Sequence, residues 1–180
     1  MRKKLLWITE TGLMLALLVT LQALTKPLGQ LVTGSFVNSI LAVTALVSGL
    51  PGGIAVAVVS PVLAYLLGIA PNILTVPPIM AGNALYVAAL YLIAGRSRHL
   101  PRRIAAWLCA AAVKFGVLYG AVVWLICGVF SRRLLDTGLL KAPMLKALPA
   151  SFSWPQLITA LIGGAVALLI TPVLRKALHR

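Results

Sequence analysis

Long apolar runs, separated by short polar or basic segments, dominate the pattern of this chain. A helix that crosses a bilayer needs about 20 mostly apolar residues, and the chain has room for about six such spans and little else. We therefore predict an all-α membrane protein, a compact bundle of six transmembrane helices that forms one integral membrane domain over residues 1–180. The predicted spans cover residues 5–24, 36–50, 54–69, 78–95, 104–130 and 154–174.

Proline and glycine mark several of the predicted boundaries. Lys26-Pro27 is expected to end the first span, and Pro51-Gly52-Gly53 to form a tight turn between the second and third spans. Pro61 should kink the third span. Pro77-Pro78 should start the fourth span, since the first N–H groups of a helix lack partners in any case. The longest loop, Ser131 to Ser153, precedes the last span.

Composition supports a membrane location. Hydrophobic residues make up 61% of the chain and charged residues only 10%, which is too few for the polar surface of a soluble domain. A net charge of +14 would suggest nucleic acid as the partner of a soluble protein. Here the basic residues stand in short clusters between apolar runs, so membrane topology explains them better. We expect contact with the lipid bilayer and none with nucleic acid.

The distribution of Lys and Arg predicts the orientation. If the N-terminus is inside, ten basic residues lie on its side of the membrane and five on the other, with Lys114 inside the fifth span. The positive-inside rule then places both termini in the cytoplasm and the loop from Ser131 to Ser153 outside. The expected location is the cell membrane, with several passes. The ten are Arg2, Lys3, Lys4, Arg96, Arg98, Arg102, Arg103, Arg175, Lys176 and Arg180, and the five are Lys26, Arg132, Arg133, Lys141 and Lys146.

Motifs and residues for catalysis are scarce. The chain has no P-loop motif for ATP, no H-E-x-x-H, no G-x-S-x-G and no cluster of carboxylates. Glu10 and Asp136 are its only acids, and His99 and His179 stand in basic segments where solvation is expected. We expect a protein that is not an enzyme and carries no cofactor or metal.

Polar and aromatic residues deep in the spans are the candidates for a binding site. A lysine near the centre of a span costs about 2.5–3.5 kcal/mol, so Lys114 should contact a ligand, snorkel toward the membrane surface or pair with Glu10. Asn83 either binds ligand or makes an interhelical hydrogen bond. The aromatic candidates equally suit packing or an interfacial belt. With the predicted topology, most candidates gather in the outer half of the bundle: Gln22, Asn38, Asn83, Tyr86, Lys114, Tyr119, Trp154 and Gln156.

Aromatic faces with a few fixed polar groups suit a small, flat, vitamin-like molecule. The outer loops carry five basic residues against one acid, Asp136, and such a field attracts anions. We therefore expect a neutral or anionic heterocyclic ligand rather than a cation such as thiamine.

Small residues recur at intervals of four in the first span, at Gly12, Ala16 and Thr20. Such a stripe lets helices approach closely in lipid. It serves either packing inside the bundle or docking to another membrane subunit.

The chain resembles the substrate-binding S component of energy-coupling factor (ECF) transporters. The resemblance rests on size, six spans, both ends inside and the small-residue stripe. It also rests on the sequence pattern from Val32-Thr-Gly-Ser-Phe-Val-Asn38 through Gly49-Leu-Pro-Gly-Gly53 and on the stretch Pro77-Pro-Ile-Met-Ala-Gly-Asn83-Ala-Leu-Tyr86. It implies that the chain captures a vitamin, a vitamin precursor or a metal ion outside, and that ATP hydrolysis in separate subunits drives release inside.

The resemblance also implies roles for particular residues. Gly12 and Ala16 fill the positions of an alanine pair that contacts the transmembrane coupling subunit, with Gly in place of one Ala. The chain lacks the histidine-led N-terminus of the cobalt and nickel subtypes, which argues against a metal substrate, and it matches no particular vitamin subtype.

Two other interpretations remain open. One is a small polytopic membrane enzyme or processing factor, against which the near absence of His, Asp and Glu in the spans counts. The other is a stand-alone carrier, although the inverted repeats and broken helices usual in carriers are not evident.

Overall fold

The computed structural model describes residues 2–95, 97 and 99–178, with side chains from residue 4 onward. Every regular element in these residues is a helix, and six helical segments are long and apolar enough to cross a membrane. The all-α, six-span prediction is therefore confirmed. Four residues named in the charge and histidine arguments, Arg96, Arg98, His179 and Arg180, lie outside the described residues. The helices are α1 (Arg2–Thr25), η1 (Lys26–Leu28), α2 (Gln30–Val47), α3 (Gly49–Leu66), η2 (Ile73–Thr75), α4 (Val76–Ala94), α5 (Leu100–Leu118), η3 (Tyr119–Val129), α6 (Ser131–Asp136), α7 (Met144–Phe152) and α8 (Trp154–Ala177).

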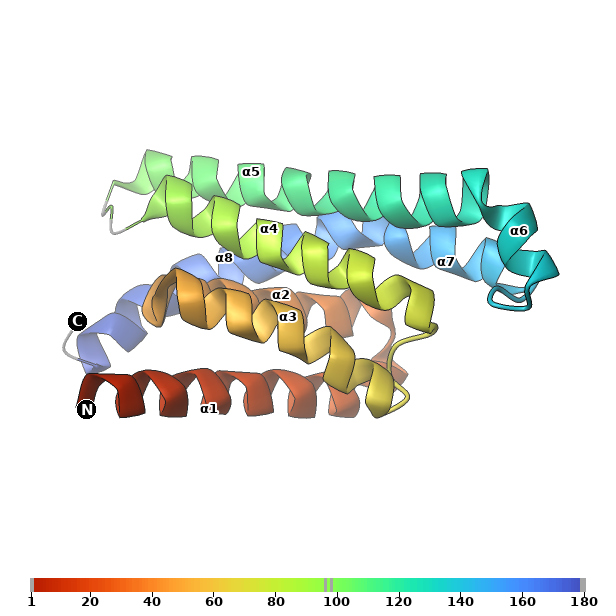
Figure 1. The fold of residues 1–180 in the computed structure, drawn as a ribbon. Helices are drawn as coiled ribbons and strands as arrows, with labels where there is room; N and C mark the ends of the chain where they lie inside the picture. Colours follow the sequence, from red (N-terminus) through yellow and green to blue (C-terminus); the bar gives the residue numbers. More distant parts are fainter. Residues whose placement is uncertain (1, 96, 98, 179–180) are drawn as a thin grey trace.

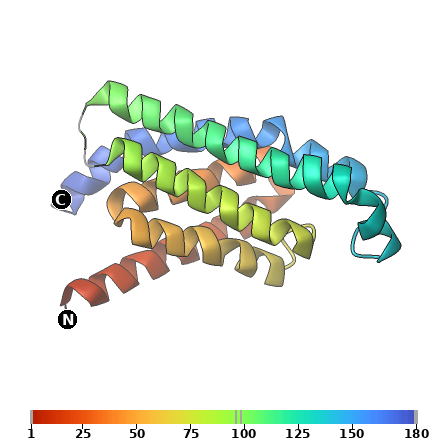
Figure 2. The same cartoon turned by 45° about the horizontal axis from the view of Figure 1, so that its top comes forward.

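The long helices run roughly side by side along one axis (Figures 1 and 2). The start of α1 and the end of α8 lie at the same end of the bundle, and α6 and α7 lie at the opposite end. For brevity, we call these the terminal end and the α7 end. Each long helix crosses the bundle from one of these ends to the other, as expected for a polytopic membrane protein.

The connection between α2 and α3 differs from the sequence interpretation. The prediction of a turn at Pro51-Gly52-Gly53 is wrong: α2 ends at Val47, and the chain turns at Ser48 and Gly49, where Gly49 has φ +85°. Pro51 lies in the first turn of α3, where a missing N–H costs nothing. A Cβ on Gly53 would lie 2.6 Å from a Val87 methyl group, so this glycine serves close packing instead.

The α7 end is more ordered than a loop. The fifth span continues past α5 as η3, which has π-type hydrogen bonding and ends at Val129. The segment predicted as the longest loop folds into α6 and α7. Leu148 and Phe152 of α7 are buried in a small apolar cluster with Leu118 and Val122 of the fifth span. This packing holds α7 across its end of the bundle.

Two adjacent glycines of α8 set the close contacts at the centre of the bundle. A Cβ on Gly163 would lie 2.7 Å from the backbone nitrogen of Ser39 in α2. A Cβ on Gly164 would overlap the indole ring of Trp107 in α5, whose Nε1 donates to the carbonyl of Leu161. Gly163 therefore allows a close approach of the α8 and α2 backbones, and Gly164 makes room for the Trp107 side chain of α5.

Basic side chains at the terminal end hydrogen-bond to backbone carbonyls. Arg102 donates to the carbonyl of Ile93 near the end of α4, and Arg175 donates to that of Leu46 near the end of α2. Cations at helix C-termini satisfy carbonyls that lack helical partners and interact favourably with the helix dipole. The basic residues thus stabilise helix ends as well as marking one side of the molecule.

Candidate ligand-binding site

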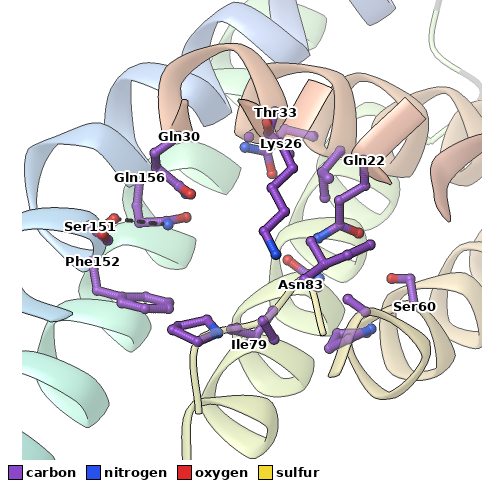
Figure 3. Close-up of a pocket in the computed structure, with 18 of the residues that line it drawn as sticks. Gln22, Lys26, Gln30, Thr33, Ser60, Ile79, Asn83, Ser151, Phe152 and Gln156 are labelled. Atoms are coloured by element: carbon purple, nitrogen blue, oxygen red, sulfur yellow. Dashed lines mark hydrogen bonds between the residues drawn. The ribbon is translucent and has the colours of Figure 1, made fainter. Parts of the chain in front are cut away.

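A cavity of about 350 Å³ lies in the half of the bundle nearest α7. It is lined mainly by the end of α1, the start of α2, the end of α3, the start of α4, one residue of α5, and the junction of α7 and α8. The amides of Gln30 and Gln156 face it from one side and that of Gln22 from the other (Figure 3). Its lining also includes Lys26, Thr33, Gly34, Asn38, Ser60, Ile79, Asn83, Lys114, Ser151 and Phe152.

Lys114 joins three helices beside this cavity. Its side chain is only 3% exposed, and Nζ donates hydrogen bonds to Oδ1 of Asn38 at 2.5 Å and to Oδ1 of Asn83 at 2.6 Å. The same nitrogen lies 5.6 Å from the centroid of the Tyr86 ring, a distance typical of a cation–π contact. Of the alternatives for Lys114, neither snorkelling nor pairing with Glu10 occurs within the described residues, because the side chain is buried and its partners are two amides.

A chain of hydrogen bonds holds the amide partners in place. Asn38 Nδ2 donates to Thr159 Oγ1 at 3.1 Å, and Thr159 donates in turn to the carbonyl of Gln156 at 3.2 Å. Gln156 Nε2 donates to the carbonyl of Ser151 at 3.1 Å, shown as the dashed line in Figure 3. Gly34 makes room for Thr159, since a Cβ there would lie 2.9 Å from its methyl group. The polar cluster is therefore fixed from α2 through α8 to α7.

The structure brings six of the eight predicted site residues together. Five of them line the cavity, and Tyr86 is fully buried beneath Lys114, with its hydroxyl donating to the carbonyl of Ala160 at 3.4 Å. Five residues share one feature, a polar group at the cavity wall: Gln22, Asn38, Asn83, Lys114 and Gln156.

Tyr119 and Trp154 lie away from the cavity. Their side chains are 45% and 67% exposed, and each ring centroid lies 5.7 Å from that of Phe115. Helix geometry explains both positions, because one residue corresponds to about 100° of rotation. Tyr119 follows Lys114 by five residues and Trp154 precedes Gln156 by two, so each points to a different face from its cavity-lining neighbour.

Sequence reasoning missed the start of α2 and the end of α7. Gln30 and Thr33 line the cavity, but the segment before Phe36 was expected to lie outside a span. A signal was available for the first two, because Gln30 and Thr33 are three residues apart and so lie on one helix face. Phe152 carried no such signal, since its place in the wall depends on how α7 packs against η3.

The side chains at the cavity are suited to bind and orient a small molecule but offer little for catalysis. They supply one buried ammonium group, several amides and hydroxyls, and apolar walls, with no carboxylate in the lining. Among the described residues, no group of three or more His, Cys, Asp and Glu side chains is placed to hold a metal ion. This arrangement suits a small molecule with apolar and polar parts.

The small-residue stripe lies on the outer face of α1. Gly12, Ala16 and Thr20 are all exposed, and a Cβ on Gly12 would meet no atom within 4 Å beyond its own helix. Of the two alternatives for the stripe, packing inside the bundle does not occur in the described chain. The stripe faces lipid or another protein.

Comparison with known proteins identifies a family. A family model described as the substrate-specific component of ECF transporters matches residues 7–175. No curated protein and no solved structure matches the chain.

Proposed function

Because this chain belongs to the family of ECF transporter substrate-specific components, we propose that it captures a vitamin or related small molecule outside the cell membrane. A transmembrane coupling subunit and ATPase subunits then drive uptake with ATP, while this chain performs no catalysis. One observation carries the proposal: a cavity of about 350 Å³ whose wall holds a buried lysine and its amide partners. A charged side chain at this depth in a membrane is costly, and such residues typically mark a site of binding or transport.

The proposed orientation places the terminal end in the cytoplasm and the α7 end outside. Lys4, Arg102 and Arg175 lie on helices that begin or finish at the terminal end, in line with the positive-inside rule. The cavity lies toward the α7 end, so this orientation opens it to the outer side. Capture from outside requires that arrangement.

Binding is tested by incubating the purified protein in lipid nanodiscs with a cell extract filtered to small molecules. Compounds that remain after washing are identified by mass spectrometry. Ala70→Trp places an indole at the cavity wall and should abolish retention, whereas Ala147→Trp on the exposed face of α7 should not. Equal retention by the two variants would show that the compounds bind elsewhere.

Docking of the coupling subunit is proposed for the stripe of Gly12, Ala16 and Thr20. Flat, exposed helix surfaces allow the close approach on which association in lipid depends. Ala16→Leu should prevent co-purification with the coupling subunit and leave small-molecule retention intact. Ala105→Leu, an equal change at another exposed position, is the matched control. Normal co-purification of Ala16→Leu would place the interface elsewhere.

A further inference from the structure

We propose that the captured molecule is a carboxylate anion, and that its carboxylate accepts hydrogen bonds from Lys114 Nζ and Asn83 Nδ2. This inference rests on the proposed binding function and adds the chemical class of the ligand and the two groups that select it. The sequence alone left neutral and anionic ligands equally open. The geometry around Lys114 decides between them.

Charge is the first step. Lys114 lies within a predicted membrane-spanning segment and is almost fully buried, and no carboxylate pairs with it among the described residues. Amide oxygens and an aromatic face stabilise an ammonium group only as dipoles and a quadrupole. Because a buried charge without a counter-charge is costly, an anionic ligand is the species that this site stabilises most.

The count of donors and acceptors is the second step. An ammonium group has three N–H donors, and Asn38 and Asn83 accept two of them. Asn38 Nδ2 is already engaged with Thr159, but Asn83 Nδ2 has no acceptor among the described residues. One N–H of Lys114 and the amide nitrogen of Asn83 therefore remain as donors beside the cavity. A carboxylate accepts only, and its two oxygens match two donors.

The charge of Lys114 and the donors beside it also disfavour other polar groups on the ligand. A cation would meet an ammonium group instead of a counter-charge. A primary amide could accept a hydrogen bond through its carbonyl, but it would leave the charge of Lys114 without a counter-charge. A phosphate group carries up to two charges and three acceptor oxygens, more than Lys114 and Asn83 satisfy without a third donor. Lys26, the other cation of the wall, uses one of its three N–H donors on the carbonyl of Gly68 at 2.6 Å, and it adds to the positive charge that favours an anion.

The rest of the cavity suits the body of a compact acid. Its volume of about 350 Å³ lies near the lower end of the range for ligand pockets. Phe152 and Ile79 provide apolar walls, and the Gln22, Gln30 and Gln156 amides offer neutral hydrogen-bonding groups.

The decisive variant is Asn83→Asp. Aspartate has nearly the shape of asparagine and still accepts from Lys114, but it supplies the counter-charge and removes the free N–H donors of residue 83. Retention of the acid should fall about tenfold to a hundredfold, while the thermal midpoint stays at or above that of the unaltered protein. Lys114→Met should lose retention to a similar extent. Lys141→Met, the same change on an exposed residue, should retain the acid normally.

The experiment uses nanodisc-embedded full chain, the filtered extract as probe, and mass spectrometry in both ion polarities. The methyl ester of the retained acid is then tested and should bind at least about tenfold more weakly. Retained compounds that are neutral or cationic, an ester that binds as well as its acid, or undiminished retention by Asn83→Asp would each overturn the carboxylate inference and leave the binding function standing. If the unaltered protein retains no compound, the proposed function itself fails.

Discussion

The substitution Gly163→Ala tests whether the crossing of α2 and α8 holds the Lys114 cluster in place. A Cβ at residue 163 would lie 2.7 Å from Ser39 N and 2.8 Å from the carbonyl carbon of Asn38. Non-bonded heavy atoms are most stable at about 3.5–4.0 Å. Because the atoms that clash belong to the backbone, no side-chain rotation relieves them. The nearest atom, Asn38 Cβ, would lie at 2.5 Å and is also fixed by the backbone, so the two helices must separate by roughly 1 Å. Such overpacking typically costs about 1–3 kcal/mol.

That separation reaches the cavity through Asn38. Its hydrogen bond to Thr159 measures 3.1 Å, and a shift of roughly 1 Å extends it beyond the range of an effective hydrogen bond. Asn38 then no longer holds its Oδ1 toward Lys114. Gly163→Ala should therefore reduce both the stability of the protein and its retention of small molecules.

Thermal unfolding in nanodiscs measures the first effect and mass spectrometry of retained compounds the second. A loss of about 1–3 kcal/mol should lower the midpoint by about 2–10 °C in a protein of this size. The matched control is Gly116→Ala on α5, where a Cβ would meet nothing within 4 Å beyond its own helix, and its midpoint should barely change. Equal midpoints for the two variants would refute the close crossing of α2 and α8.

Three further results are expected. In a cysteine-free background, a cysteine at Thr137 should react with an impermeant reagent added outside and one at Ser97 should not; the reverse would invert the proposed orientation. Asn83→Ala should weaken binding of the retained compound by about 1–3 kcal/mol, measured by calorimetry, because it leaves a ligand group unpaired, whereas Trp154→Ala should change it by less than about 0.5 kcal/mol. Equal effects would move the site toward Trp154. Phe152→Ala should lower the free energy of unfolding by about 3–5 kcal/mol, and a loss below about 1 kcal/mol would mean that α7 is not packed on η3.

The fold follows from the sequence where burial in lipid decides it. Each apolar run became a long helix, because every backbone N–H and C=O must be satisfied within a span. The errors lie where one residue type has two uses. Pro51 suits a turn and equally the first turn of a helix, and the chain uses the second. The polar start of α2 resembled a loop, yet it is helical with Gln30 and Thr33 facing the cavity.

The site was predictable in part by helix phase. The periodicity places Asn83 and Tyr86 on one face, and the structure keeps both beside Lys114. The same periodicity, applied from Lys114 and Gln156, turns Tyr119 and Trp154 away from the cavity. A residue belongs to a site only if it lies at the right depth in the membrane and on the right face of its helix. For these two aromatic residues, the sequence interpretation had used depth alone.

The partners of Lys114 required the structure because they depend on depth across different helices. The sequence shows that this lysine needs polar neighbours, and it offered Glu10 as the one acid within a span. Gln22 lines the same cavity as Lys114, and Glu10 precedes Gln22 by 12 residues, which is about 18 Å along a helix at 1.5 Å per residue. Glu10 therefore lies far toward the terminal end. Asn38 and Asn83, the actual partners of Lys114, lie 76 and 31 residues from it in the chain. Asn38 stands at the depth of Lys114 on α2, which Gly163 of α8 approaches closely, and Asn83 stands there on α4, which packs against α5. The cavity is thus left with a cation that lacks a counter-charge of its own, and selection of an anion follows from that arrangement.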